Sequence, residues 1–125
     1  LMGTRFMASQ ECALHPKIQE RLLQARETDT LIILNSIRNA ARVIKSDFAQ
    51  SVLEMEEKGA TLEELVPLIC GLRTKQALEK GDVEDAVMAC GQIIGLIHDI
   101  PSVGEIIEGI ISEAKLIRQR LYNSQ

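Results

Sequence analysis

LMGTRF, residues 1–6, is an apolar run that stops on a glycine, a threonine and an arginine. A chain end at a protein surface is usually polar, because nothing compensates the entropy lost when it becomes ordered. The pattern predicts a buried strand over residues 1–7. Since a strand with unpaired edges needs neighbours, the opening residues indicate the interior of a larger fold.

Composition places the chain among ordinary globular domains. The 125 residues are 46% hydrophobic, and 14 basic against 18 acidic side chains give a net charge of -4 without a Lys/Arg cluster. We therefore expect no nucleic-acid partner and no anionic-membrane surface. Aromatic residues make up only 2% of the chain. An aliphatic core is predicted, and binding by base stacking is disfavoured.

The cysteines and the apolar runs indicate the compartment. Cys12, Cys70 and Cys90 are odd in number, far apart and without a CxxC pair, which is not typical of a disulfide framework. We interpret them as small buried hydrophobes in a reducing, cytoplasmic setting. No apolar run approaches the roughly 18 residues of a spanning helix, so no membrane association is expected.

The first half of the chain mixes helix and strand signals. Pro16 suits the first position of a helix, with Ile18 and Leu22 on its apolar side. TLIIL at 30–34 is typical of a short buried strand, although a buried helical turn has the same pattern. Residues 40–44 are ambiguous.

After residue 46 the sequence carries the start and stop signals of helices. Asp47 with Gln50 resembles a capping box, and Thr61 with Glu64 forms a complete one. A further helix is predicted from Asp82, after the stop signal of Gly81, with one apolar face for four turns. That face comprises Val83, Ala86, Val87, Cys90, Ile94 and Ile97.

A pair of glycines and one more capping box belong to the predicted helices of the C-terminal part. Gly91 and Gly95, four residues apart, would let another backbone approach closely. Ser102 with Glu105 predicts a capping box that opens the last helix, whose apolar face is Ile106, Ile107, Ile110, Ala114, Ile117 and Leu121.

Catalytic and metal motifs are missing from the sequence. There is no HExxH, DxDxDG, CxxC, GxGxxG or P-loop pattern, so we expect no metal site and no phosphate site of those classes. His15, before Pro16, is best explained as a helix start. His98 and Asp99 are adjacent, and adjacent residues of a helical segment point about 100° apart, which disfavours a catalytic dyad.

Three stretches carry a resemblance to a known family. MGTRFMASQECALHPKIQERL at 2–22, TDTLIILNSIRNAARVIK at 28–45 and GQIIGLIHDIPSVGEII at 91–107 resemble, in order, the C-terminal portion of nitronate monooxygenases, formerly called 2-nitropropane dioxygenases. The resemblance implies an FMN-binding (β/α)₈ barrel with a helical second domain. The chain would be its mainly α C-terminal fragment, with one or two remnant strands.

The resemblance also implies boundaries and site residues. Residues 1–27 would be the last barrel strand and the following helix, 28–46 a connecting segment with a possible strand, and 47–125 a helical domain. Residues of the FMN phosphate site would be Met2, Gly3, Thr4 and Arg5. Gln92 would lie near the cofactor or substrate. The family's catalytic histidine matches neither histidine of this chain, so no catalytic residue is assigned.

The activity implied by the resemblance is oxidative denitrification of alkyl nitronates with O₂, or enoyl-ACP reduction as in close relatives. The partner would be a small nitronate-like substrate. With most of the barrel lacking, we expect the isolated chain to be inactive and not to retain FMN. The alternative hypothesis is a helical interaction module without catalytic activity. Under both hypotheses exposed apolar surfaces predict a homo-oligomer.

Overall fold

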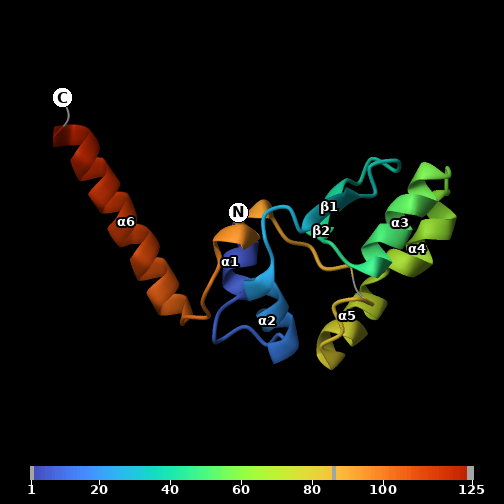
Figure 1. Cartoon of the computed structure of the whole chain (residues 1–125), viewed down its shortest axis with the longest axis horizontal. Helices are drawn as coiled ribbons and strands as arrows, with labels where there is room; N and C mark the ends of the chain where they lie inside the picture. The colour runs from blue at the N-terminus through green and yellow to red at the C-terminus, as the bar shows by residue number, and fades with distance from the viewer. Residues whose placement is uncertain (1, 86, 124–125) are drawn as a thin grey trace.

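The computed structural model describes residues 2–85 and 87–123, and these are mainly helical with one two-stranded sheet (Figure 1). This confirms the predicted fold class. In chain order the elements are α1 (Gly3–Met7), α2 (Pro16–Gln24), β1 (Thr30–Ile33), β2 (Ala41–Ile44), α3 (Asp47–Glu57), α4 (Leu62–Ile69), α5 (Gly71–Lys80), the 3₁₀ helix η1 (Gln92–Leu96) and α6 (Val103–Asn123).

The predicted strand over residues 1–7 is wrong. Residues 3–7 form α1, Met2 precedes it outside regular structure, and Leu1 lies outside the described residues. Thr4 and Ala8, one helical turn apart, are 8% and 0% exposed, so one side of this turn faces the body. An apolar run this short has too little periodicity to separate a strand from a buried helix. A helix also satisfies its own backbone where no strand lies alongside.

The first apolar core lies between α2, β2 and the segment after α5. Pro16 occupies the first position of α2, and the Lys17 N–H donates a 3.2 Å hydrogen bond to His15 Nδ1, which confirms the predicted helix start. Ile18 and Leu22, one turn apart, are fully buried. The core comprises Ile18, Leu22, Ala25, Ile44, Val83, Met88, Cys90 and Ile94.

The second core lies between the sheet and the helices α3 and α4. Strands β1 and β2 are antiparallel, with Ile33 opposite Ala41. This confirms the predicted strand at 30–34 and assigns the ambiguous stretch 40–44 to its partner. The buried residues of this core are Ile33, Leu34, Val43, Ala49, Val52 and Leu65. The domain boundaries at residues 27 and 46 stay a prediction, and the first core draws on all three predicted segments.

A buried carboxylate holds the turn between β1 and β2. Glu56 in α3 is 9% exposed, and it accepts hydrogen bonds from the Leu34 N–H at 2.5 Å and from the Ser36 N–H and hydroxyl at 3.0 and 2.7 Å. Leu34 has a φ of +62°, a conformation that residues other than glycine rarely adopt. The hairpin turn therefore depends on Glu56.

Side-chain caps begin α3 and α4. Ser46 Oγ accepts a 3.1 Å hydrogen bond from the backbone N–H three residues on, so the helix start predicted from Asp47 and Gln50 is wrong by one residue. Thr61 and Glu64 make the two reciprocal bonds of the predicted capping box. Local spacing thus located both helix starts to within one residue.

The predicted helix between residues 82 and 97 is wrong, because its middle runs alongside β2 instead. The Ile44 N–H donates to the Met88 carbonyl at 2.9 Å, and the Cys90 N–H donates to the Arg42 carbonyl at 3.1 Å. In the described part of this stretch only η1 is helical. The segment therefore extends the sheet edge rather than forming a helical hairpin.

The edge of β2 explains this outcome. A two-stranded sheet leaves backbone groups unpaired along its edges, and an isolated bridge between Val43 and Ala89 joins this segment to β2. Met88 and Cys90 are buried while Ala89 is exposed, an alternation typical of a strand. The same apolar positions also fit one face of a helix, which is why the sequence pattern predicted a helix here. Ala86, which belonged to the predicted face, lies outside the described residues.

Gly95 lets η1 approach the chain that follows α2, which confirms the predicted close approach at this glycine, although the neighbour is not a helix. At Gly91 the prediction is wrong, because a Cβ there would lie 3.7 Å from its nearest neighbours. A Cβ at Gly95 would lie 2.7 Å from the backbone nitrogen of Glu27. We expect Gly95→Ala to lower the free energy of unfolding by about 1–3 kcal/mol, as measured by urea denaturation.

Gly109→Ala is the matched control for that substitution. A Cβ there meets no described atom within 4 Å, and alanine favours helix over glycine by up to about 1 kcal/mol. This variant should be as stable as the parent or slightly more stable. Equal unfolding midpoints for the two alanine variants would contradict the close approach.

The last helix starts at the predicted capping box. Glu105 accepts hydrogen bonds from the Ser102 N–H and hydroxyl at 2.8 and 2.7 Å, and Ser102 Oγ accepts one from the Glu105 N–H at 3.2 Å. From there α6 projects away from the rest of the molecule (Figure 1). Among the described residues, none of the helices has the length and apolar character needed to cross a membrane.

Candidate functional site

Gly3 opens the five-residue helix α1 in an exposed position, and the next residue, Thr4, is 8% exposed. The first N–H groups of a helix have no carbonyl acceptor within it, and Met2 supplies no side-chain cap. A Cβ added at Gly3 would meet no described atom within 4 Å, and the first turn holds no acidic residue. At Gly3 a phosphate oxygen could therefore approach the backbone without a side chain or an acidic residue of the first turn in its way.

Thr4 joins this segment to the GQ motif. Its side chain is largely buried, and Oγ1 accepts a 2.9 Å hydrogen bond from the Gly91 N–H, across 87 positions of sequence. A hydroxyl that accepts one hydrogen bond still has its own proton to donate. Thr4 can thus hold α1 against η1 and donate to a second group at the same time.

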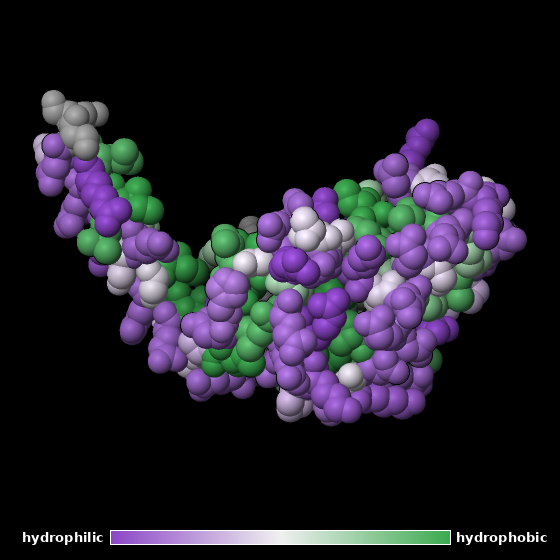
Figure 2. Space-filling view, viewed as in Figure 1, coloured by the Kyte–Doolittle hydropathy of each residue, from purple (hydrophilic) through white to green (hydrophobic). Residues whose placement is uncertain are grey.

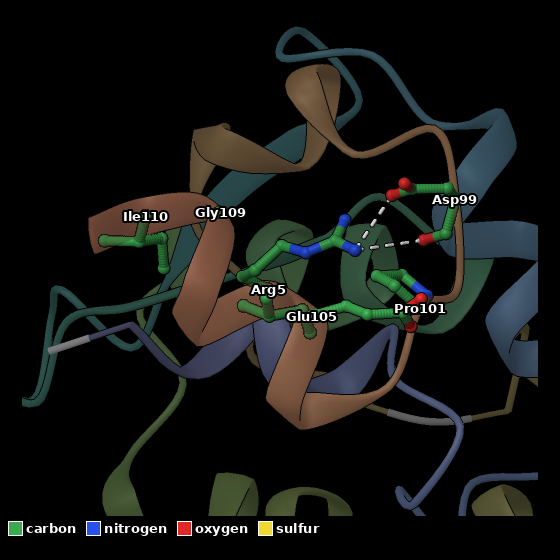
Figure 3. A pocket seen from close by; sticks show the side chains of 7 residues that line it. Arg5, Asp99, Pro101, Glu105, Gly109 and Ile110 are labelled. Carbon is green, nitrogen blue, oxygen red and sulfur yellow. Dashed lines mark hydrogen bonds and ion pairs between the residues drawn. The ribbon is translucent and has the colours of Figure 1, made fainter. Parts of the chain in front are cut away.

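Arg5 is engaged with the DIPS motif. Its guanidinium forms a 2.8 Å ion pair with the Asp99 carboxylate and a 3.4 Å hydrogen bond to the Asp99 carbonyl (Figure 3). The pair borders a cavity of about 400 Å³ between α1, the loop before α6 and the start of α6. Its other lining residues are Pro101, Glu105, Ile106, Gly109 and Ile110. Arg5 therefore orients the loop that leads into α6.

Gln92 lies in a different cavity. It is exposed at the start of η1 and lines a space of about 430 Å³ together with Glu27, Ile93, Gly95 and Leu96. Arg5 is not among these residues, so the structure does not bring the two predicted site residues into one cavity. A contact between Gln92 and cofactor or substrate stays a prediction.

The remaining reactive side chains have structural or solvent-facing positions. Burial raises the pKa of the Cys90 thiol to about 11, although Arg42 and Arg21 act in the opposite direction. Cys90 is therefore a protonated core residue, in line with its interpretation as a small buried hydrophobe. That interpretation is wrong for Cys70, which is exposed, and Cys12 is only half-buried. His98 is exposed, and the carboxylate of its neighbour Asp99 is directed to the guanidinium of α1.

Sequence reasoning missed the two interactions that hold α1 in place. The Thr4–Gly91 hydrogen bond and the Arg5–Asp99 ion pair join residues 87 and 94 positions apart. Local spacing contains no signal for such pairs. Both partners nevertheless fall within the end motifs that carried the resemblance, so the two motifs are in contact in space.

We expect Thr4→Val to lower the free energy of unfolding by about 1–3 kcal/mol, because the partly buried Gly91 N–H would lose its acceptor. Chemical denaturation measures the change. Thr4→Ser keeps the hydroxyl and should retain most of the stability. A valine variant as stable as the parent, with serine as the destabilised one, would show that the methyl contact rather than the hydrogen bond matters, and would contradict this expectation.

Comparison with known proteins agrees with this architecture. The family model described as nitronate monooxygenase matches residues 1–113. The structure of FabK from Thermotoga maritima matches with 33% identity and a TM-score of 0.88, covering 99% of this chain and 39% of that chain. The M276A mutant of the same protein matches with 32% identity and a TM-score of 0.79, covering 99% of this chain and 36% of that one.

The chain therefore spans only 39% of the length of the first of these structures, and it corresponds to part of a TIM-barrel protein. The family model covers nearly the whole chain, and the observed contact between the two end motifs fits that match. The chain belongs to the nitronate monooxygenase family, whose members are in general FMN-dependent oxidoreductases.

Proposed function

We propose that this chain supplies the phosphate-binding segment and the helical part of an FMN-dependent oxidoreductase. The observation that carries the proposal is the open approach to Gly3, next to the anchored hydroxyl of Thr4, in a chain of this family. The N–H groups of both residues and the Thr4 hydroxyl would hold the phosphate, with Met2 and Arg5 flanking it. FMN supplies the redox chemistry when bound.

The positioning of that segment is the part of the chemistry that this chain performs. Thr4 is held by the Gly91 N–H and Arg5 by Asp99, so α1 is fixed at two adjacent positions. A phosphate site needs donors that keep their geometry without reorganisation when the ligand binds. The GQ and DIPS motifs would therefore support FMN binding through α1 rather than by touching the flavin.

The isolated chain should not bind FMN tightly. It spans well under half of the matched FabK chain. Phosphate-binding residues alone would leave the flavin ring without contacts. Titration of FMN with the purified chain, followed by flavin fluorescence, is expected to show no saturation up to about 100 μM, the weak limit for a few hydrogen bonds. Tight binding by this chain alone would contradict the claim that the site needs the rest of the fold.

For the reaction, we propose oxidation of an alkyl nitronate by O₂, with a small nitronate-like molecule as substrate. The description of the matching family model supports this. Enoyl-ACP reduction is the second candidate, favoured by the match to FabK over 99% of this chain. Assays of the protein expressed from its full reading frame distinguish the two reactions. Nitronate-dependent O₂ consumption supports the first, and NAD(P)H oxidation that depends on an enoyl thioester supports the second.

The lack of a nucleic-acid partner stays a proposal, supported by the net charge of -4. A cytoplasmic setting is likewise proposed, on the three dispersed cysteines without a CxxC pair. The competing proposal for the chain is a self-associating helical module without activity. Its support is the exposed apolar surface, which includes Leu96 at 74% and Leu72 at 66% exposure. Sedimentation analysis at high concentration tests it, because a strictly monomeric chain would exclude it.

A further inference from the structure

The loop between η1 and α6 is tied to the chain that follows α1. The Gln10 N–H donates a 3.0 Å hydrogen bond to the Pro101 carbonyl. The Val103 N–H donates to both carboxylate oxygens of Glu11, at 3.1 and 2.9 Å, and so gains the acceptor that a helix cannot supply to its first N–H groups. The loop therefore keeps its place beside the segment around α1 through contacts that do not involve Asp99.

Asp99 extends from this fixed loop to Arg5. A single guanidinium nitrogen of Arg5 donates to the Asp99 carboxylate at 2.8 Å and to the Asp99 carbonyl at 3.4 Å (Figure 3). The Arg5 side chain is 19% exposed and that of Asp99 is 73% exposed. An ion pair with so open a partner contributes little to global stability. Its main effect is therefore local, on the orientation of α1.

The orientation of α1 depends on two contacts that point in different directions. The helix has only five residues, and a helix this short is not stable in water by itself. Thr4 and Arg5 are adjacent, so their side chains point about 100° apart around the axis. The Thr4–Gly91 hydrogen bond alone would leave α1 free to turn about that contact. The Arg5–Asp99 ion pair removes this freedom.

Arg5 is not placed as a free cation beside Gly3. Helical spacing puts its side chain about 160° around the axis from the position of Gly3. Its guanidinium is already paired with a carboxylate, so the pair carries no net charge. A contribution of Arg5 to a phosphate site at Gly3 and Thr4 thus comes from the contact with the loop rather than from attraction between opposite charges.

We propose that Asp99 is a positioning residue for the FMN phosphate site. Through Arg5 it fixes the orientation of α1, and with it the Gly3 backbone and the Thr4 hydroxyl. The inference rests on the proposed function and deepens it, because it assigns a role to an acidic residue that does not touch the phosphate. The sign of the effect is diagnostic. A carboxylate repels a phosphate dianion, so removing its charge would tighten FMN binding if repulsion dominated, whereas the positioning role predicts weaker binding.

The test titrates the apoprotein, prepared from the full reading frame, with FMN and separately with riboflavin. Riboflavin has the same ring system but no phosphate, so it does not report on the phosphate site. In Asp99→Asn we expect the Kd for FMN to rise at least about 5-fold, because donors that must reorient on binding lose affinity. The Kd for riboflavin should change by less than about 2-fold.

The other outcomes of this titration overturn the inference. Unchanged or tighter FMN binding in Asp99→Asn would show that Asp99 does not position the site. Equal weakening for FMN and riboflavin would show a general structural role. A parent protein that binds no FMN would overturn the proposed function, and the inference with it. A parent that binds FMN normally beside an unaffected variant would overturn the inference alone, so the two failures are distinguishable.

Two further variants separate positioning from direct contact. Arg5→Gln should weaken FMN binding about as much as Asp99→Asn, and the double variant should be no weaker than either single one, because both substitutions break the same contact. If Arg5 bound the phosphate itself, Arg5→Gln would be much the weaker variant, and this would contradict the positioning role of Asp99.

Glu108→Gln is the matched control. Glu108 is exposed in α6, and the substitution removes a charge of the same sign without touching α1. FMN should bind this variant as tightly as the parent. A loss of affinity equal to that of Asp99→Asn would contradict a specific role for Asp99.

Discussion

Replacing Glu56 by alanine is expected to lower the free energy of unfolding by about 3 kcal/mol, because the N–H groups of Leu34 and Ser36 would lose their acceptor in a buried place. Leu34 would also have to keep its φ of +62° without support. Urea denaturation at about pH 7 measures the change. Glu57→Ala is the control, since Glu57 is exposed in the same helix, and it should change stability by less than about 0.5 kcal/mol.

The contribution of Glu56 should also depend on pH. Burial opposes its charge, but hydrogen bonds from Ser36 and Leu34 prevail and hold its pKa below the ordinary value of 4.5. A carboxyl whose pKa is lower in the folded state stabilises the fold above its unfolded pKa, and this stabilisation is lost as the pH falls through the folded pKa. The stability difference between parent and Glu56→Ala should therefore shrink below pH 4.5. A stability difference that stays constant into the acid range would contradict the proposed role of the charged Glu56 carboxylate as acceptor for the turn.

Leu22→Ala should cost about 2–5 kcal/mol of unfolding free energy, because Leu22 is fully buried where α2 meets the segment after α5. A loss of this size is a large share of the stability of a small domain. Thermal and urea denaturation measure it. Leu72→Ala makes the same chemical change at a position that is 66% exposed, and should cost less than about 1 kcal/mol. If both variants lost equal stability, the first core would not be where the structure places it.

Local signals predicted the helix starts because capping is local chemistry. Thr61 with Glu64 and Ser102 with Glu105 satisfy backbone groups within four residues, so spacing alone identifies them. Ser46 shows the limit of this reasoning. It caps α3 in place of the adjacent Asp47, and either side chain could serve from the sequence alone.

Two wrong predictions, the strand over residues 1–7 and the helix from Asp82, have a common cause. An apolar run can form either a strand or a helix, and contacts with distant backbone decide which of the two it forms. Met88 to Cys90 became a sheet edge because β2 presented unpaired groups there. The opening residues became a helix, anchored by Thr4 on Gly91 and by Arg5 on Asp99. No local pattern reports such partners, which lie about ninety residues away in sequence. The resemblance predicts the residues of the site, and the structure shows what holds two of them, Thr4 and Arg5.

The central claim is that this chain is part of an FMN-dependent oxidoreductase, and one measurement tests it most directly. The protein is expressed from its full reading frame, and its intact mass is determined together with its absorbance between about 350 and 500 nm, where a bound flavin absorbs. We expect a species much heavier than 13.9 kDa that is yellow and releases FMN on denaturation. A colourless species of only 125 residues would contradict the claim and leave the family membership without the activity.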